Sequence, residues 1–313
     1  MAYRIRRREP VGKGLRRIVG EQIRKAERVA RDTARPQEDR VHDVRTRLKR
    51  SRAVLALIRA DGGEQVRRDD RRLRDVARVL SRPRDLAVQA HTFRLLGTRL
   101  QSEVPPRLVA GLSSVERRVR RGLRPDEVER DLRRAARMLR RVRRRLGSWH
   151  LAHGRRAISG GITRMYRKAR AGLEAVRAEP SPERFHDWRK QVKALSNQLR
   201  LIRRAIPELT TTLMPKIDRL GELLGEVHDL HCAYATAEMH PRSFGRAKDG
   251  LVVLSAVEER RAALESEALA LADTVFSGRA RDVRALIKTG WRTWRRGEPP
   301  ATEPAEPPAA TLH

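Results

Sequence analysis

Two stretches of this chain, which begin at His42 and His186, share a residue pattern at a fixed offset of 144 positions. The first is HDVRTRLKRSRAVLALIR and the second is HDWRKQVKALSNQLRLIR, and eight of the eighteen aligned positions are identical. An internal repeat restricts the fold, because both copies are expected to form the same structural unit. The identical pairs are His42/His186, Asp43/Asp187, Arg45/Arg189, Lys49/Lys193, Leu55/Leu199, Leu57/Leu201, Ile58/Ile202 and Arg59/Arg203.

Each copy of the repeat has the period of an α-helix with one apolar face. Successive residues of a helix turn by about 100°, so every third or fourth position falls on that face. We expect both faces to lie in the core, with Asp43 and Asp187 near the helix starts, where a carboxylate complements the macrodipole. The apolar faces consist of Val44, Leu48, Ser51, Leu55 and Ile58 in the first copy, and of Trp188, Val192, Leu195, Leu199 and Ile202 in the second.

A basic stripe runs beside the apolar face in both copies. Charges on an ordinary surface helix lie opposite the core, whereas Arg and Lys at the core boundary can lay their stems along apolar surface and extend their charged ends into a groove. Ordinary surface charge is the alternative, but His, Arg and Lys recur at the same three offsets, which argues against it. The stripe consists of His42, Arg45, Lys49 and Arg52 in the first copy and of His186, Arg189, Lys193 and Arg200 in the second, with Lys190 and Asn197 at its edge.

The charge of the chain predicts a polyanionic partner. Lys and Arg total 72, of which 63 are Arg, against 39 Asp and Glu, so the formal net charge is +33. A compact domain with this charge is expected to bind nucleic acid, an anionic membrane or polyphosphate. Arg suits phosphate because its planar fork donates two parallel hydrogen bonds and stays charged at physiological pH. Aromatic residues make up only 4% of the chain, which argues against base-stacking platforms for single-stranded nucleic acid.

Other features of the sequence favour a soluble, cytoplasmic protein. Cys232 is the single cysteine, so neither an intrachain disulfide nor a cysteine-based metal cluster is expected. The first ten residues are charged and lack the apolar segment of a secretory signal. The longest apolar run, near residues 251–257, is too short to span a bilayer. We therefore expect no membrane insertion.

The rest of the chain has helical periodicity interrupted by Pro and Gly, and no segment has the alternation of a strand. These patterns predict an all-α fold in two related halves, about 11–147 and 154–296, followed by a disordered Pro- and Glu-rich tail at 297–313. The 144-residue offset also aligns Arg84-Asp85 with His228-Asp229. A short turn is expected at 81–85 around Pro83. The predicted helices are 13–33, 41–60, 67–80, 86–100, 107–123, 125–146, 161–176, 185–205, 217–237, 250–276 and 279–295.

These motifs resemble the CHAD family, the conserved histidine α-helical domain, over about residues 3–296. No second domain of the triphosphate-tunnel (CYTH) type that some relatives carry is evident in the sequence, so the chain looks like a stand-alone member. The segments that carry the resemblance are 42–52 (HDVRTRLKRSR), 84–88 (RDLAV), 186–193 (HDWRKQVK), 224–230 (LGEVHDL), 9–17 (EPVGKGLRR) and 291–295 (WRTWR).

The resemblance implies two antiparallel four-helix bundles related by a pseudo-two-fold axis, with a basic groove or pore between them. It further implies non-catalytic binding of inorganic polyphosphate, without a cofactor, and association with polyphosphate granules and their proteins. The implied ligands of polyphosphate are His42, Arg45, Lys49, Arg52, His186, Arg189, Lys190, Lys193 and Arg200. Weaker candidates are Arg17, Arg74, Arg84, Arg164 and His228.

Two departures from the family pattern occur in the His helices. Ser51 stands where relatives often have an apolar residue, and Ser196-Asn197 stand where relatives usually have a basic or aromatic residue. The second stripe is therefore expected to hold phosphate less strongly. His42 and His186 add charge only when protonated, and neighbouring Arg and Lys should lower the pKa of both. We expect tighter binding below about pH 6.5, the unperturbed His value.

Two other functions remain open at the level of sequence. The His-Asp pairs 42–43, 186–187 and 228–229 could serve as metal ligands of a phosphohydrolase, although neighbouring cations would repel a divalent ion and adjacent helical residues point about 100° apart. Nonspecific nucleic-acid binding is the second, through the Arg-rich segment 133–145, since a basic helix can follow a phosphate backbone without contacting bases. A solvated bundle face is the simpler interpretation of that segment.

Overall fold

The computed structural model describes residues 3–102, 104–146, 149, 154–244 and 247–297. Their regular structure is entirely helical, which confirms the all-α prediction, and none of the described helices has the length and apolar character needed to cross a membrane. The helices are α1 Val11–Arg31, α2 Gln37–Leu57, α3 Gly63–Val79, α4 Ser81–Leu100, α5 Pro106–Arg121, α6 Pro125–Arg144, α7 Gly154–Ala178, α8 Pro182–Ile202, α9 Pro207–Glu238, the 3-10 helix η1 Pro241–Phe244, α10 Ala247–Val275 and α11 Ala280–Arg296.

Proline marks where many of these helices begin. Pro10 and Pro36 immediately precede α1 and α2, while α5, α6, α8 and α9 have Pro as their first residue. Proline suits these positions because the first N–H groups of a helix have no intrahelical partner. Ser181 adds an N-cap at α8, where its hydroxyl accepts a hydrogen bond from the backbone N–H of Arg184 at 3.3 Å.

The predicted turn at 81–85 is wrong, because Pro83 lies in the first turn of α4. Only Leu80 separates α3 from α4. A proline in a first turn removes no intrahelical hydrogen bond, so it permits a helix start and does not require a loop.

Several other helix boundaries differ from the predicted ones, among them the starts of α7, α9 and α2. α7 begins at Gly154 and α9 at Pro207, well before the predicted starts at 161 and 217. α2 begins at Gln37, so His42 and Asp43 lie in its second turn and Asp43 is paired with Arg35 at 2.9 Å. At the chain end, α11 stops at Gly297, which has a φ of +85°. The remainder of the predicted tail, 298–313, lies outside the described residues.

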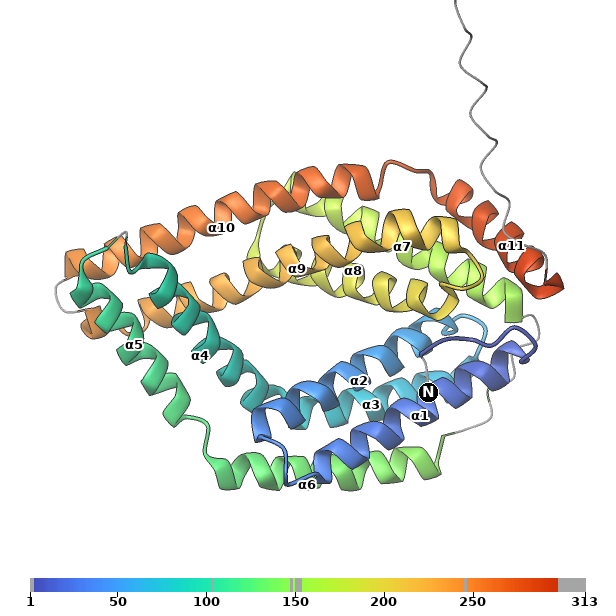
Figure 1. The fold of residues 1–313 in the computed structure, drawn as a ribbon, viewed down its shortest axis with the longest axis horizontal. Coiled ribbons are helices and arrows are strands. Elements are labelled where there is room, and N and C mark those ends of the chain that lie inside the picture. The colour runs from blue at the N-terminus through green and yellow to red at the C-terminus, as the bar shows by residue number, and fades with distance from the viewer. Residues whose placement is uncertain (1–2, 103, 147–148, 150–153, 245–246, 298–313) are drawn as a thin grey trace, which may run out of the picture.

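The helices of each half pack mainly with one another (Figure 1). In the first half, α1 and α3 both pack against α2 and α6. In the second half, α8 lies between α7 and α9, α9 packs against α10, and α7 packs against α11. The apolar faces predicted for the two His helices are buried, including Ser51, whose hydroxyl donates to the carbonyl oxygen of Arg47 at 3.0 Å.

The two halves meet directly along α2, which packs against both α7 and α8. α7 crosses close to the end of α2 at Gly161, where a Cβ atom would lie 2.2 Å from the carbonyl oxygen of Leu57. The buried Gln198 of α8 donates from its side-chain Nε2 to the carbonyl oxygen of Ala53 in α2 at 3.1 Å. The backbones of α2 and α7 are therefore in close contact at the seam between the halves.

The α4–α5 pair reaches from the first half to the second. α4 packs against α9, and α5 contacts η1 and α10. Figure 1 shows this pair at the left end of the molecule, away from α1 and α11. The arrangement places the start of α4, with Arg84 and Asp85, beside both His helices and α9.

Candidate functional site

Five cations from three helices gather where the two halves meet. Arg45 and Lys49 come from α2, Arg84 from α4, and Arg189 and Lys193 from α8. Desolvation and then repulsion by Arg189, Arg45, Arg84 and Lys193, in that order, lower the pKa of Lys49 to about 8. We call these five residues the central cluster.

The Lys49 side chain is accessible to water although the protein around it desolvates its amine. More than a third of the residue's surface is exposed, yet desolvation is the main cause of its lowered pKa. Lys193 has a lowered pKa for the same main reason, with Arg189 next in importance. A cation in this setting can reach a ligand from solvent while gaining from the lower dielectric of the protein.

Two arginines of the central cluster have buried N–H groups without acceptors. Arg45 donates from Nη1 to the carbonyl oxygen of Ala77 at 2.9 Å, which anchors α2 against α3. Within the described residues, the buried Nε atoms of Arg45 and Arg189 and the buried Nδ1 atom of His186 have no hydrogen-bond partner. Buried donors in this state are unfavourable, and an acceptor placed beside them would relieve the cost.

Asp85 and Asp229 face the central cluster, and sequence analysis did not include either of them in the polyphosphate site. Asp85 lies on α4 and Asp229 on α9. Burial raises the pKa of Asp229, and Arg189, Arg84 and Lys49 oppose that rise. No direct ion pair joins either carboxylate to the cluster within the described chain. The 144-residue offset, which aligns Asp85 with Asp229, was the signal that could have found them.

Three histidines lie at the edge of the central cluster with lowered pKa values. The rings of His186 and His228 are 4.3 Å apart, centre to centre. Burial, followed by His186 and Arg189, lowers the pKa of His228 to about 4. Burial also lowers the pKa of His42 and His186, with Arg84 and Lys190 the next causes respectively. The expected direction for His42 and His186 is confirmed, and the lowered pKa values favour the neutral form of all three rings.

Glycines on α9 make room for the two cations of α8. A Cβ atom at Gly221 would lie 3.0 Å from Cε and 3.1 Å from Nζ of Lys193. At Gly225, one turn later, a Cβ atom would lie 3.6 Å from Nε and Nη2 of Arg189. The aliphatic stem of Lys193 therefore lies on bare helix backbone at Gly221, where a larger residue would displace its amine.

Neighbouring carboxylates pair with four of the cations that were predicted as ligands or weaker candidates. Asp70 of α3 pairs with Arg52 at 2.9 Å and with Arg74 at 3.1 Å. Asp218 of α9 pairs with Arg200 at 2.6 Å and accepts from the hydroxyl of Ser196 at 2.6 Å. The exposed Lys190 pairs with Asp187 at 2.8 Å. These cations are less available to a ligand than the central cluster.

The weaker candidates Arg17 and Arg164 are engaged at other places. Arg17 donates to both carboxylate oxygens of Glu9 at 2.8 Å and pairs with Glu21 at 3.2 Å. Arg164 donates to the carbonyl oxygen of Leu57 at 3.3 Å at the seam between the halves. Arg84 and His228, also predicted as weaker candidates, lie within and beside the central cluster.

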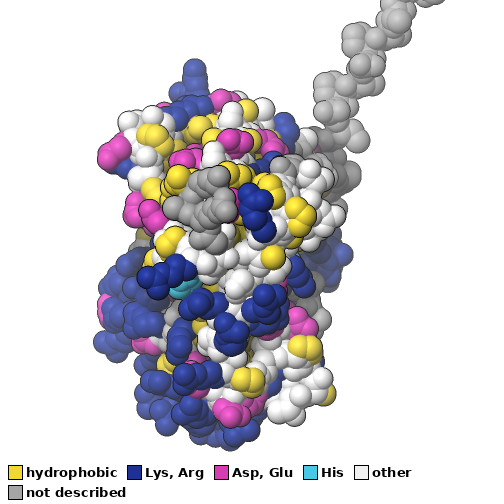
Figure 2. Space-filling model, turned by 90° about the vertical axis from the view of Figure 1, so that its left-hand side faces the viewer, with side chains coloured by type: hydrophobic (Ala, Val, Ile, Leu, Met, Phe, Trp, Pro, Cys, Tyr) yellow, Lys and Arg dark blue, Asp and Glu magenta, His cyan; other side chains and the backbone are white. Residues whose placement is uncertain are grey.

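Basic side chains are also dense on the outside of the first half. Figure 2 shows Lys and Arg covering much of the lower part of one face, at the height of the first-half helices in Figure 1. The exposed face of α6 contributes Arg134, Arg137, Arg140 and Arg144. Among the described residues, no group of three or more His, Cys, Asp or Glu is arranged to hold a metal ion.

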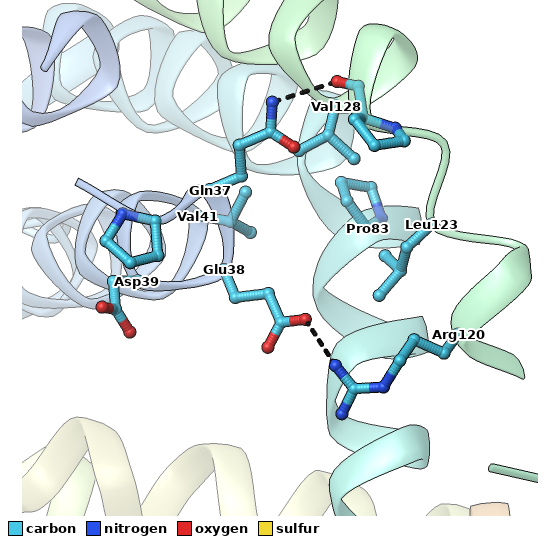
Figure 3. A pocket seen from close by; sticks show the side chains of 10 residues that line it. Gln37, Glu38, Asp39, Val41, Pro83, Arg120, Leu123 and Val128 are labelled. Carbon is cyan, nitrogen blue, oxygen red and sulfur yellow. Dashed lines mark hydrogen bonds and ion pairs between the residues drawn. The ribbon is translucent and has the colours of Figure 1, made fainter. Parts of the chain in front are cut away.

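A mixed pocket of about 360 Å³ lies at the start of α2 (Figure 3). Its wall includes the apolar side chains of Val41, Leu123 and Val128. An ion pair between Glu38 and Arg120 at 3.4 Å crosses it. Its lining contains none of the central cluster, so it is a separate feature.

Comparison with known families identifies the chain. A family model described as the CHAD domain matches residues 17–238, which is more than half of the chain. The chain belongs to the CHAD family. The matched region of this CHAD domain includes both His helices, α4 and α9, and with them the whole central cluster.

No curated protein matches this CHAD domain. Among solved structures, the crystal structure of the CHAD domain from the plant Ricinus communis is similar to it, with 16% sequence identity and a TM-score of 0.46. The similarity covers 88% of this chain and 89% of that chain.

Proposed function

We propose that this protein binds inorganic polyphosphate without catalysing its reaction, through a basic groove lined by the central cluster. The observation that carries the proposal is that five cations from three helices converge, and that in the described part of the chain buried Arg and His nitrogens beside them lack hydrogen-bond partners. The CHAD family is linked to polyphosphate binding in general, which supports the same ligand.

The chemistry of polyphosphate suits this arrangement. Each phosphate unit carries charge and acceptor oxygens, and recognition requires only many donors placed along a linear chain. A charge-assisted hydrogen bond contributes about 1.5–3 kcal/mol. Several such bonds in series, with release of counterions, give binding that is tight and sensitive to salt. The unpartnered Nε donors of Arg45 and Arg189 would gain acceptors.

We infer a groove because some cations are accessible to solvent although the surrounding protein desolvates them. Lys49 combines both properties, as expected of a side chain on a concave surface. Arg45 and Arg189, and likewise Lys49 and Lys193, are equivalent positions of the repeat. We infer that a pseudo-two-fold axis relates two four-helix bundles and presents both pairs to one ligand.

The proposed cellular role follows from the proposed ligand. A protein that binds polyphosphate without consuming it would associate with polyphosphate granules and the proteins found there, in the cytoplasm. Charge repulsion among Lys49, Arg45 and Arg189 in the free protein would be relieved when the polyanion binds.

Binding of long-chain polyphosphate at physiological salt tests the proposal, with double-stranded DNA as competitor. The test variant is Arg45→Ala/Lys49→Ala/Arg189→Ala/Lys193→Ala. Its matched control replaces the exposed α6 residues Arg134, Arg137, Arg140 and Arg144 by Ala, which removes the same charge at another surface. We expect loss of tight, DNA-resistant binding in the test variant alone.

Equal losses in both variants, or displacement by DNA at comparable concentration, would show that net charge alone explains the binding. Nucleic-acid binding is the second candidate, favoured by the exposed arginines of α6, and in that case the α6 variant would lose DNA affinity more than the central one. Release of phosphate from polyphosphate upon addition of Mg²⁺ or Mn²⁺ would contradict a non-catalytic role.

A further inference from the structure

A second cluster of cations lines a pocket between α7 and α11. The pocket has a volume of about 280 Å³ and lies where the first turns of α7 face α11, at the right end of the molecule in Figure 1. It shares no residue with the central cluster. It is lined by Arg155, Arg156, Ser159, Arg284, Lys288 and Arg292.

The α11 cations of this pocket share one helical face. Arg284, Lys288 and Arg292 are spaced four residues apart, so they form one row along α11. Arg155 and Arg156 belong to the first turn of α7, whose backbone N–H groups and positive dipole end also favour an anion. Five cationic side chains therefore line one small volume.

The described lining of this pocket includes no carboxylate, in contrast to the comparable place in the first half. There, α1 packs against α6, and Arg143 of α6 pairs with Glu27 of α1 at 3.2 Å. Arg17 of α1 is likewise held by Glu9 and Glu21. In the described part of the chain, none of the five cations of the α7–α11 pocket forms an ion pair, and Nε of Arg284 is buried without a partner.

We propose that the α7–α11 pocket is a separate binding site for a compact oligophosphate anion, with several phosphate groups close together. Its bounded volume suits a short anion, whereas a long chain would extend beyond it. The guanidinium forks of Arg155, Arg156, Arg284 and Arg292 match the geometry of phosphate oxygens, and Lys288 adds a point charge. This site is independent of the function proposed for the central cluster.

Titration calorimetry with tripolyphosphate at physiological salt tests the site. The protein carrying the four alanines at Arg45, Lys49, Arg189 and Lys193 serves as the background, because any tripolyphosphate site of the central cluster is then removed. In this background we expect one remaining site per chain. Adding Arg284→Gln/Lys288→Gln/Arg292→Gln should lower its affinity about tenfold or more.

Two further variants make the outcome decisive. Arg137→Gln/Arg140→Gln/Arg144→Gln on exposed α6 removes the same charge, and we expect it to leave the site intact. Lys288→Glu, a single change at an exposed position, should weaken binding even if the triple change impairs folding. The site is disproved if the background protein binds no tripolyphosphate, or if the α6 change weakens binding as much as the α11 change.

These results also separate the two proposals. If the central cluster binds no phosphate chain but the α7–α11 pocket does, the wild-type protein will bind one tripolyphosphate, which only the α11 variants remove. If the central proposal alone holds, the background protein will bind none.

Discussion

Gly221 is a single position at which one absent methyl group determines where a cation lies. We predict that Gly221→Ala lowers polyphosphate affinity about three- to tenfold, because the new Cβ would displace the end of Lys193. The fold should survive and gain up to about 1 kcal/mol of stability, since Ala favours a helix more than Gly does. Fluorescence-detected polyphosphate titration and urea unfolding measure the two effects.

Gly225→Ala is the matched control for this substitution. The position lies one turn further along the same buried face, where the new Cβ would be at ordinary contact distance from Arg189. The gain in helix stability should be similar and the affinity nearly unchanged. Equal affinities for the two variants would mean that the position of Lys193 does not matter for the ligand.

Lys49 should take up a proton when polyphosphate binds at alkaline pH. Its pKa of about 8 in the free protein leaves the amine mostly neutral at pH 9, and a bound polyanion favours the charged form. Calorimetry at pH 9 in two buffers of different ionisation enthalpy should show this uptake, which should be much smaller at pH 7. In Lys49→Arg the contribution should vanish, because Arg is charged throughout. Identical uptake in that variant would contradict the assignment.

At the residue scale, the cations of the central cluster could be predicted from the sequence, but the carboxylates that pair with other stripe cations could not. Arg45, Lys49, Arg189 and Lys193 were predicted from the repeat, and the structure brings them together. Which stripe cations are already paired could not be predicted. Asp70 and Asp218 lie on helices whose packing against α2 and α8 determines that they reach Arg52 and Arg200. Such contacts depend on tertiary geometry, which periodicity along one helix does not contain.

At the scale of helices, α2 is tied to α6 by a buried ion pair. Arg40 is 1% exposed, pairs with Glu129 at 2.7 Å and donates to the carbonyl oxygen of Ala30 at 2.7 Å. We predict that Arg40→Met lowers the free energy of unfolding by about 3–5 kcal/mol, because a carboxylate and carbonyl oxygens lose their partner. Thermal and urea unfolding measure the loss.

Arg120→Met is the matched control for this substitution, because it removes an ion pair that is exposed to solvent. Arg120 pairs with Glu38 of α2 at 3.4 Å, and both side chains are about half exposed. Since exposed ion pairs contribute about 0–1 kcal/mol, this variant should stay close to the wild type. A loss as large as that of Arg40→Met would show that the burial of the pair is not what matters.

An ion pair between α8 and α9 holds Arg200, which lies at the C-terminal end of the basic stripe. Asp218→Asn should raise polyphosphate affinity about two- to fivefold, because Arg200 would lose its carboxylate partner and become available. Titration of the variant at several salt concentrations should also give a steeper salt dependence. If affinity and salt dependence are both unchanged, Arg200 lies outside the path of the ligand.

At this scale, the sequence predicted most helices but misplaced several of their starts. Pro83 was assigned to a turn, and Pro207 falls between the predicted helices 185–205 and 217–237, whereas both prolines occupy first turns, of α4 and α9 respectively. A proline before or inside a first turn gives the same local signal as one that ends a helix. The early part of α7, from Gly154, contains two glycines and two arginines, so its helical periodicity is weak.

For the whole molecule, the histidines should make stability depend on pH, and a bound polyanion should weaken this dependence. His42, His186 and His228 have lowered pKa values, so the unfolded chain binds protons more readily than the folded protein below about pH 6.5. Their contribution to stability is thus lost as pH falls from about 6.5 toward the folded values, about 4 for His228. A bound polyanion favours the protonated rings and reduces this loss.

We therefore predict that saturating polyphosphate raises the melting temperature more at pH 5 than at pH 7.5. Calorimetric scans at fixed ionic strength measure both shifts. The variant His42→Gln/His186→Gln/His228→Gln controls for carboxylates that titrate in the same range, and the difference between the two pH values should shrink in it. Equal shifts in the wild type would rule out a contribution from the rings.

The repeat predicted two helical halves, but the way they are joined required the structure. Nothing in the periodicity of 81–121 indicates that α4 and α5 leave the first half and pack against α9 and α10. That crossing brings Arg84 beside the cations of α2 and α8. Long-range packing of this kind depends on the shapes of complete helices, which short sequence windows do not describe.

The buried bond from Gln198 to Ala53 fixes how far apart the cations of α2 and α8 lie before any ligand arrives. In the proposed binding mode, preset spacing of this kind reduces the protein conformational entropy that is lost on association. A thin, flexible anion can adapt its path to such fixed spacing. A stiff duplex adapts less well, so a fixed spacing of cations favours the flexible chain in the proposed binding mode.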